Sequence, residues 1–193
     1  MLTFYFAAGS SSMAPHIALH EVGATFEARP LSFGRRETHT PDYLALNPEG
    51  KVPLLLIDGR QLTEVAGILF YLARRFPEAG LLPTGDIEAE ARAVSWMAFA
   101  ASALHPARAL PPDAAQAVWR VAEQRMGDGG WILGRYSVAD IHVFRLFWRF
   151  HERAQLDPAH FPRLHAHHDR MLERPAVQHV LRVEQALGYE VPV

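Results

Sequence analysis

The stretch Ser10-Ser11-Ser12-Met13-Ala14-Pro15-His16-Ile17-Ala18-Leu19 decides how this chain folds, together with a second stretch further along the sequence. Its serines can cap a helix, and Pro15 would lie in the first helical turn, where its missing N–H is harmless. The second stretch is Asn47-Pro48-Glu49-Gly50-Lys51-Val52-Pro53-Leu54, followed by Leu62-Thr63-Glu64. It predicts a turn, a Val-Pro junction that enters a strand, and an acidic residue that opens another helix.

The composition is that of an ordinary globular protein. The chain has 193 residues, of which 49% are hydrophobic, and its formal net charge is -2. This charge gives no electrostatic footprint for nucleic acid or for an anionic membrane. No apolar run is long enough to cross a bilayer, and the first residues lack the basic region of a signal peptide. Cysteine is absent, which excludes disulfides and thiolate chemistry of the chain itself. We expect a cytoplasmic protein.

The first part of the chain predicts a mixed α/β domain. Residues 2–6 and 26–31 read as strands, and a helix capped by Ser11 or Ser12 should lie between them. A hairpin should turn at Asp58-Gly59, because this dipeptide favours two-residue turns. Residues 64–76 keep helical apolar spacing. The order is therefore β-α-β followed by β-β-α, and we expect a four-stranded mixed sheet.

The second part of the chain predicts helices only. We assign residues 1–77 to the first domain, 78–85 to a linker and 86–193 to an all-helical domain, because residues 77–85 hold two Pro and two Gly. One apolar stripe is expected from Val94, Met97, Ala98, Ala101 and Leu104. Residues 105–113 contain three prolines and cannot form one regular helix.

The tetrapeptide Ser137-Val138-Ala139-Asp140 predicts the start of a buried helix. It has the spacing of a capping box, in which the serine and the acidic side chain each satisfy the other's backbone N–H. The residues that follow are rich in Phe, Leu and Trp, so this helix should be buried. We therefore interpret Asp140 as structural.

These segments resemble the cytosolic glutathione transferases, and most closely the bacterial beta class. The resemblance covers nearly the whole chain, and its motifs are Tyr5, residues 10–19, residues 47–53, Leu62-Thr63-Glu64, Leu104-His105 and residues 137–140. It implies a thioredoxin-like N-terminal domain, an all-helical C-terminal domain and glutathione as cosubstrate, with no metal. It also implies a homodimer, in which Arg74 and Arg75 could pair with Glu88 or Glu90 of the partner.

Thiolate stabilisation is the chemistry that the resemblance assigns to the serines. A free thiol with a pKa of roughly 8.5 is only a few per cent ionised at pH 7. A helix N-terminus and a hydroxyl both favour the anion. We choose Ser11, with Ser12 or Ser10 as alternatives, and Tyr5 as a further candidate that matches a beta-class tyrosine. The position of Ser11 is usually cysteine in the beta class, so a mixed disulfide with glutathione is not possible here.

The remaining glutathione contacts are also implied by the resemblance. A cis Val52–Pro53 bond would turn the Val52 backbone outward, where an extended peptide could pair with it as an added strand. Glu64 would bind the γ-glutamyl ammonium, and the N–H of Val65 would bind the glutamyl carboxylate. The residue after the acid is usually small and hydroxylated, so Val65 loses one hydrogen bond. The glycine carboxylate would meet the cations Arg35, Arg36 and Lys51, and His105 matches a beta-class histidine near the sulfur.

Each of these residues also has a purely structural interpretation. The serines could serve simply as helix caps, Glu64 could be a first-turn acid stabilised by the helix dipole, and His105 could be a cation at a helix end. His165 and Asp169 share a helix face, as a zinc pair would, but no third ligand is evident. The leading function is transfer of glutathione to a small hydrophobic electrophile. The alternatives are a glutathione-dependent isomerase of the zeta type, whose cysteine is missing here, and a non-catalytic binding or assembly module.

Overall fold

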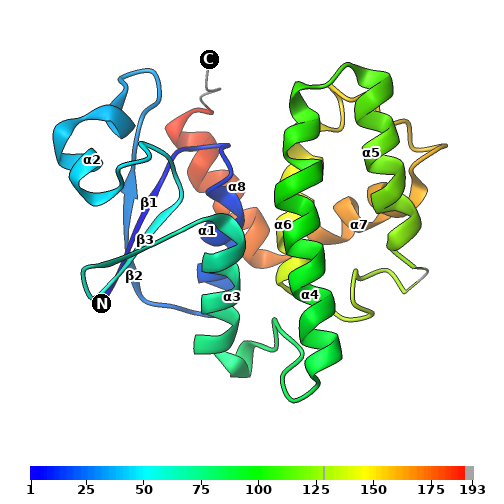
Figure 1. Ribbon diagram of the computed structural model, residues 1–193, viewed down its shortest axis with the longest axis horizontal. Helices are drawn as coiled ribbons and strands as arrows, with labels where there is room; N and C mark the ends of the chain where they lie inside the picture. The colour runs from blue at the N-terminus through cyan, green and yellow to red at the C-terminus, as the bar shows by residue number, and fades with distance from the viewer. Residues whose placement is uncertain (128, 190–193) are drawn as a thin grey trace. The chain divides into compact units, whose positions relative to one another are not determined.

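The structure is a computed structural model, and it describes residues 1–127 and 129–189. It consists of two compact units. The first contains Met1–Leu72 and the last helix, α8 (Pro175–Leu187), and the second contains Ala73–Arg174 (Figure 1). The chain therefore returns to its first unit after completing the second.

A four-stranded mixed sheet in the order β2-β1-β3-β4 is the centre of the first unit. Strand β1 (Leu2–Phe6) pairs in parallel with β2 (Phe26–Pro30) and antiparallel with β3 (Leu54–Ile57). Strand β3 pairs antiparallel with β4 (Arg60–Thr63), and both residues of the Asp58-Gly59 turn have positive φ. Positive φ at both positions is what a two-residue hairpin turn requires. The predicted sheet and hairpin are confirmed.

Helices cover both faces of this sheet. Helices α1 (Met13–Glu21) and α3 (Val65–Arg75) lie on one face and α2 (Pro41–Leu46) on the other (Figure 1). The side chains of β1 alternate accordingly. The Phe6 ring lies 4.6 Å from the His16 ring of α1, whereas the Tyr5 ring lies 5.6 Å from the Tyr43 ring of α2, centroid to centroid.

Helices make up the regular structure of the second unit, as expected. They are α4 (Ile87–Phe99), a π-helical turn (Ala100–Leu104), a 3₁₀ turn (Pro106–Ala109), α5 (Pro112–Arg125), α6 (Val138–Phe150) and α7 (Pro162–Leu172). The prediction that residues 105–113 do not form one regular helix is confirmed. The 3₁₀ turn and two following prolines separate α4 from α5, because proline cannot donate to a preceding helical turn.

The core of the second unit lies between α4, α5, α6 and α7. Trp119 and Phe147 are almost fully buried, and their rings meet edge to face at 5.7 Å. Helix α4 contributes Trp96 and Met97 to its buried face, but the stripe predicted for this helix is partly wrong. Val94 is 46% exposed, because the buried face begins one residue earlier, at Ala93. Ala98 and Ala101 are exposed as well.

The predicted capping box at the start of α6 is confirmed, and its acid has further partners. The Asp140 carboxylate accepts hydrogen bonds from the Ser137 N–H and the Ser137 hydroxyl, both at 2.8 Å. It also accepts from the Ile132 N–H at 2.9 Å and lies 3.1 Å from His167 Nε2. All four groups lie within the second unit, and Asp140 is fully buried. Burying a carboxylate is costly unless it is hydrogen-bonded, and this network supplies the partners.

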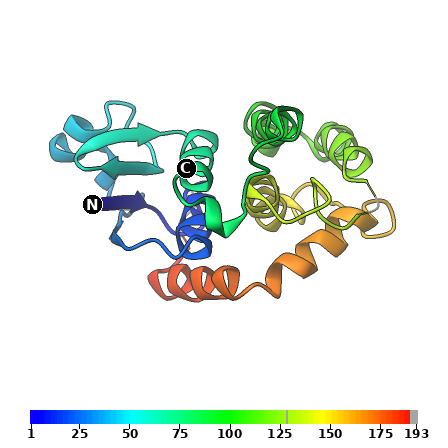
Figure 2. The same cartoon turned by 90° about the horizontal axis from the view of Figure 1, so that it is seen from below.

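The last helix differs from the expected division of the chain. Residues 86–193 were expected to form one helical domain, but α8 packs on α1 within the first unit. A buried pair provides the reason: His16 Nδ1 of α1 lies 2.8 Å from Glu184 Oε1 of α8. Figure 2 shows α8 alongside α1 from below. The linker assigned to residues 78–85 stays a prediction.

Candidate functional site

The loop before α1 holds two of its three serine hydroxyls internally. The Ser12 hydroxyl accepts from the Ala7 N–H at 3.1 Å and lies 3.1 Å from the Ala7 carbonyl oxygen and 2.6 Å from the Ser10 hydroxyl. The Ser12 N–H donates to Ser10 Oγ at 3.2 Å. Both serines are buried. Ser12 therefore stands at the N-cap position of α1 without capping it, because its hydroxyl is turned back toward Ala7.

Ser11 is the partly exposed serine of the three. Its hydroxyl donates to the carbonyl oxygen of Val52 at 3.2 Å, and so links the loop to the segment that enters β3. Its backbone N–H has no hydrogen-bond partner among residues 1–127 and 129–189. Ser11 thus brings a hydroxyl, an N–H and the start of α1 to one place on the first unit.

Tyr5 packs against a buried cluster that contains Ala7, Tyr43 and Val52. Its side chain lies on the α2 face of the sheet, where it lines a cavity of about 480 Å³. The other residues that line this cavity come from β2 and from positions 31–46, and none of the three serines is among them. The Tyr5 ring also contacts the Tyr43 ring, and its role in stabilising the thiolate stays a prediction.

The Val52–Pro53 bond is cis, as the sequence predicts. Val52 is buried, and the turn before it is held from two sides. The Lys51 carbonyl oxygen accepts from the Tyr43 hydroxyl at 2.6 Å and from Asn47 Nδ2 at 2.8 Å. Gly50 has φ +62, and a Cβ there would lie 3.1 Å from the Thr38 carbonyl oxygen, so this turn requires glycine.

Tyr43 and Asn47 hold the turn before Val52, a role that sequence reasoning did not assign. Burial raises the pKa of Tyr43 to about 12, so its hydroxyl stays protonated and remains a donor at neutral pH. Asn47 Oδ1 also accepts from the Glu49 N–H at 3.2 Å, which closes the turn. The available signal was the Asn-Pro-Glu-Gly tetrapeptide, since asparagine binds its own turn backbone.

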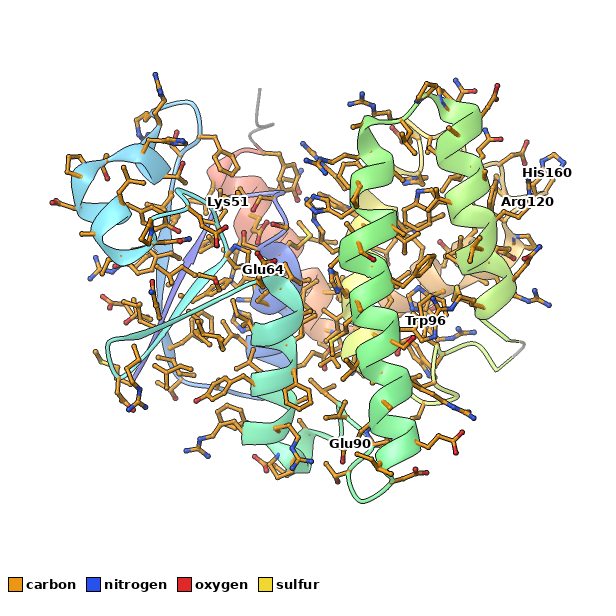
Figure 3. The ribbon with its side chains drawn as sticks, in the orientation of Figure 1. Lys51, Glu64, Glu90, Trp96, Arg120 and His160 are labelled. Atoms are coloured by element: carbon orange, nitrogen blue, oxygen red, sulfur yellow. The ribbon has the colours of Figure 1, made fainter. Side chains whose placement is uncertain are left out.

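Glu64 lies between β4 and α3 in an unusual backbone conformation. Its φ is +65, a region that residues other than glycine rarely adopt. Its carbonyl oxygen accepts the first helical hydrogen bond from the Ile68 N–H at 3.0 Å. Its side chain is exposed, and within the described residues its carboxylate has no hydrogen-bond or ion-pair partner. Backbone strain of this kind is often retained at functional sites. Figure 3 shows Glu64 at the start of α3.

The three cations predicted for the glycine carboxylate are exposed, and two of them are already paired. Lys51 Nζ donates to Glu49 at 3.2 Å, and Arg35 Nε donates to Glu37 at 2.9 Å. Lys51 precedes the Val52 segment directly, whereas Arg35 lies near the 3₁₀ turn at residues 37–39. Exposed pairs of this kind are weak and can exchange for a ligand carboxylate. Arg36 has φ 55 at the start of the same turn.

His105 belongs to the second unit. It directly follows the π-helical turn, and its N–H donates to the Ala100 carbonyl oxygen at 2.9 Å. Burial, together with the nearby charges of Arg108 and Arg145, lowers the pKa of His105 to about 4. His105 is therefore neutral at pH 7. The π turn is consistent with a functional position, because such turns are frequent at functional sites.

The described part of the chain has no group of three or more His, Cys, Asp or Glu side chains that could hold a metal ion. His165 Nε2 lies 2.7 Å from the Leu156 carbonyl oxygen, and Asp169 pairs with His168 at 3.3 Å. These two side chains are thus engaged with other partners. None of the described helices is long and apolar enough to span a membrane.

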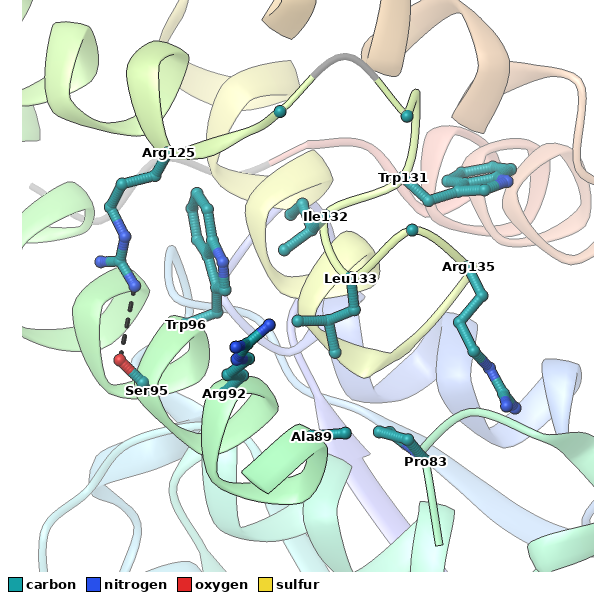
Figure 4. A pocket seen from close by; sticks show the side chains of 13 residues that line it. Pro83, Ala89, Arg92, Ser95, Trp96, Arg125, Trp131, Ile132, Leu133 and Arg135 are labelled. Atoms are coloured by element: carbon teal, nitrogen blue, oxygen red, sulfur yellow. Dashed lines mark hydrogen bonds between the residues drawn. The ribbon is translucent and has the colours of Figure 1, made fainter. Parts of the chain in front are cut away.

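The helical unit contains a cavity of about 590 Å³ that is separate from the predicted site residues. Three arginines line it together with Trp96, Trp131 and residues of the 127–135 segment. Figure 4 shows the Arg125 guanidinium beside the Trp96 ring, 4.3 Å from its centroid, and bonded to the Ser95 hydroxyl at 3.4 Å. The two large cavities and the serine loop are therefore different places, and the chemistry predicted from the sequence lies at the loop.

Two family models match this chain. The glutathione S-transferase N-terminal domain matches residues 1–74, and the glutathione S-transferase C-terminal domain matches residues 110–182. Glutathione S-transferase GstA of Escherichia coli O157:H7 is 30% identical over 200 residues, which cover 95% of this chain and 98% of that protein. This chain belongs to the glutathione S-transferase family.

Solved structures of other glutathione transferases agree with this assignment. A glutathione transferase homologue from Sulfitobacter, solved with bound glutathione, is 31% identical and covers 95% of this chain and 98% of its own, with a TM-score of 0.88. The bacterial beta class glutathione S-transferase of Sphingomonas chungbukensis is 33% identical and covers 94% and 98%, with a TM-score of 0.83. The protein is a glutathione transferase, and glutathione is its cosubstrate.

Proposed function

We propose that this glutathione transferase conjugates the glutathione thiolate to small hydrophobic electrophiles, and that the Ser11 hydroxyl stabilises the thiolate. The observation that carries this proposal is the different fate of the three serine hydroxyls. Those of Ser10 and Ser12 are buried and bound within the loop, whereas that of Ser11 is partly exposed and reaches the Val52 carbonyl oxygen. A ligand beside Val52 would therefore meet Ser11 first.

The first unit offers groups for each charged part of glutathione. The Val52 N–H has no hydrogen-bond partner among the described residues and can pair with the cysteinyl residue as an added strand. The free carboxylate of Glu64 suits the γ-glutamyl ammonium, and the N–H of Val65 at the start of α3 suits the glutamyl carboxylate. Lys51 and Arg35 are the cations available for the glycine carboxylate. A cosubstrate bound in this way would place its sulfur near the N-terminus of α1.

Activation of the thiol then requires modest electrostatics. Lowering a thiol pKa by ~2 units means preferring the anion by about 2.7 kcal/mol. One hydrogen bond to a charged acceptor contributes about 1.5–3 kcal/mol, and a helix N-terminus contributes about 0.3–1 kcal/mol. The Ser11 hydroxyl, its free N–H and the α1 terminus are together sufficient. In this mechanism the hydroxyl turns its proton from the Val52 carbonyl oxygen to the sulfur.

The decisive experiment follows the ultraviolet absorbance of the thiolate against pH with saturating glutathione. We expect bound glutathione to ionise about 2 pH units lower than free glutathione. A panel of small electrophiles, assayed for loss of glutathione, then identifies the acceptor class. If the bound thiol titrates like glutathione in water, the site does not activate it, and the non-catalytic alternative takes the lead.

The isomerase alternative uses the same thiolate but regenerates it. An isomerase would convert its substrate without consuming glutathione, so the two functions separate when thiol concentration and product are measured together. The echo of the zeta-type serine run at Ser10 and Ser11 motivates this comparison. The absence of the following cysteine argues against the isomerase.

We also propose a cytoplasmic homodimer, with α3 and α4 at the interface, as in the family. The cross-subunit ion pairs expected from the sequence need revision. Arg74 Nη1 donates to Glu90 at 3.2 Å within the chain, and Arg92 pairs with Glu88 along α4. These acids are therefore already paired in one subunit. Light scattering that shows a monomer at micromolar concentration would contradict the dimer.

A further inference from the structure

Helix α8 reaches the loop that carries the serines from the far end of the chain. The Glu184 carboxylate accepts from the Gly9 N–H at 2.7 Å through Oε2 and lies 2.8 Å from His16 Nδ1 through Oε1. The carboxylate, the N–H and the imidazole are all buried, and Glu184 has no exposed surface. One side chain of α8 thus holds both the loop before α1 and the first turns of α1 itself.

A second residue of the C-terminal segment packs on the same glycine. Gly9 has φ +72, and a Cβ there would lie 2.9 Å from Cδ1 of Tyr189. The Tyr189 hydroxyl donates to the Leu181 carbonyl oxygen of α8 at 3.1 Å, which fixes its ring against the helix. Gly9 is therefore held by a hydrogen bond from one residue and by close packing from the other.

The hydrogen bonds on the opposite side of the loop link it to β3. Ser11 lies two residues after Gly9, and its hydroxyl is directed at the Val52 carbonyl oxygen. The Ser10 and Ser12 side chains, on either side of Ser11 in the sequence, hydrogen-bond to each other, and the Ser12 hydroxyl also bonds to the Ala7 backbone. These internal bonds make the loop stiff, so a shift at Gly9 is passed on to Ser11.

We propose that α8 positions the Ser11 hydroxyl through Glu184, with Tyr189 in support, so that Glu184 is a positioning residue for thiolate formation. This inference rests on the proposed role of Ser11. Glu184 does not touch the sulfur; it fixes where the loop can place the hydroxyl. Removing the Glu184 carboxylate would take away the buried acceptor that the Gly9 N–H and His16 Nδ1 share, and the loop would shift in response.

The test compares two substitutions of Glu184 of similar size. Glu184→Met removes both oxygens, and we expect the pKa of bound glutathione thiol to rise by about one unit, with kcat/KM at pH 6.5 falling about tenfold. The dissociation constant of glutathione should change less than about twofold, because Val52 and Glu64 remain. Glu184→Gln should stay close to wild type, because its amide oxygen can accept from Gly9 while its NH₂ donates to the other His16 tautomer.

A double variant and a control separate positioning from stability. Ser11→Ala combined with Glu184→Met should give the same thiol pKa as Ser11→Ala alone, because Glu184 acts through that hydroxyl. Val180→Ala removes a fully buried side chain of the same helix, so it should lower stability without moving the thiol pKa. Should Glu184→Met not fold, Tyr189→Ala replaces it, with a smaller rise expected in the same direction.

The outcomes distinguish this inference from the proposed function. A Glu184→Met or Tyr189→Ala protein that folds and titrates like wild type overturns the inference alone, provided that Ser11→Ala still raises the pKa. Additive effects of Ser11→Ala and Glu184→Met overturn it as well. If wild type itself leaves the thiol pKa at its value in water, the proposed function fails and the inference falls with it.

Discussion

The start of α6 and the start of α1 use serine in opposite ways. Ser137 and Ser12 both stand directly before a buried helix. The Ser137 hydroxyl joins a closed network with Asp140, which satisfies the helix end from within the chain. The Ser12 hydroxyl turns away from its helix toward Ala7 and does not cap it. Ser11 is then the serine whose hydroxyl, bonded to the Val52 carbonyl oxygen, is partly exposed near the start of α1.

The difference teaches how a helix start becomes a binding site. A fully capped terminus is stable and has nothing left to offer a ligand. A terminus whose capping hydroxyl is used elsewhere keeps N–H groups and positive potential for an anion. Two acids at helix starts show the same contrast. The Asp140 carboxylate, in the first turn of α6, has four partners, whereas the Glu64 carboxylate, at the start of α3, has none among the described residues.

The largest effect on stability should come from removing the acid that closes the start of α6. Asp140→Ala removes the carboxylate from four buried groups around the start of α6, and we expect the free energy of unfolding to fall by about 3–5 kcal/mol. Urea denaturation at pH 7 measures this loss. Asp113→Ala, at the exposed first turn of α5, is the control and should cost less than about 1 kcal/mol. A stable Asp140→Ala protein would show that the network is dispensable.

The next effect concerns the acid without partners. Glu64→Ala should leave unfolding unchanged and weaken glutathione binding by about 1.5–3 kcal/mol, which is roughly 10- to 160-fold in dissociation constant. Calorimetric titration measures it. Glu78→Ala removes an equally exposed acid outside the predicted site and serves as control. An unchanged dissociation constant would mean that Glu64 does not contact glutathione and interacts with the dipole of its own helix alone.

The serine comparison itself gives a smaller effect. Ser11→Ala should raise the pKa of the bound thiol by about one unit, or ~1.4 kcal/mol, with little change in stability. Ser12→Ala should do the reverse and lower the free energy of unfolding by about 1–3 kcal/mol, because the Ala7 N–H loses a buried acceptor. The thiolate titration and urea denaturation of both variants decide between them. A thiol pKa that responds to Ser12→Ala or Tyr5→Phe and not to Ser11→Ala would reassign the hydroxyl.

The smallest effect on stability at neutral pH is expected for His142, on the buried face of α6. Burial, together with the charges of Arg145 and His105, lowers the pKa of His142 to about 3. The folded protein therefore binds fewer protons at His142 than the unfolded chain, so stability is lost as the pH falls from about 6.5 toward 3. His142→Leu should have nearly wild-type stability at pH 7 and a shallower loss on acidification, by up to about 1.4 kcal/mol per pH unit. Urea denaturation at pH 7, 5 and 4 measures both slopes, and equal slopes would contradict the assignment.

Local signals predicted much of this molecule from sequence. The Asp58-Gly59 turn, the cis Val52–Pro53 bond and the capping box at Ser137 all depend on residues close in sequence, and the structure confirms each of them. The stripe of α4 was placed one residue late at Val94, because neighbouring small apolar residues satisfy two faces of a helix equally well.

Choices that depend on distant contacts could not be predicted. Three consecutive serines are equivalent by composition, and only the position of the Ala7 backbone decides that Ser12 turns inward. The role of Glu184 was also missed. Its helix shows an apolar stripe, and nothing local indicates that its one buried acid binds Gly9 and His16. The site assignments stay predictions until the variants above are measured.

The return of α8 to the first unit sets the order in which the chain can fold during synthesis. His16 and Glu184 are 168 positions apart, so the loop before α1 cannot be completed until nearly the whole chain has left the ribosome. The helical unit is one continuous segment, Ala73–Arg174, and can fold earlier. At 5–20 residues per second, synthesis from Leu72 to Glu184 takes about 6–22 seconds, during which the surface of the first unit that binds α8 is uncovered. In nascent chains, Met1–Leu72 is therefore the segment most exposed to proteolysis and aggregation.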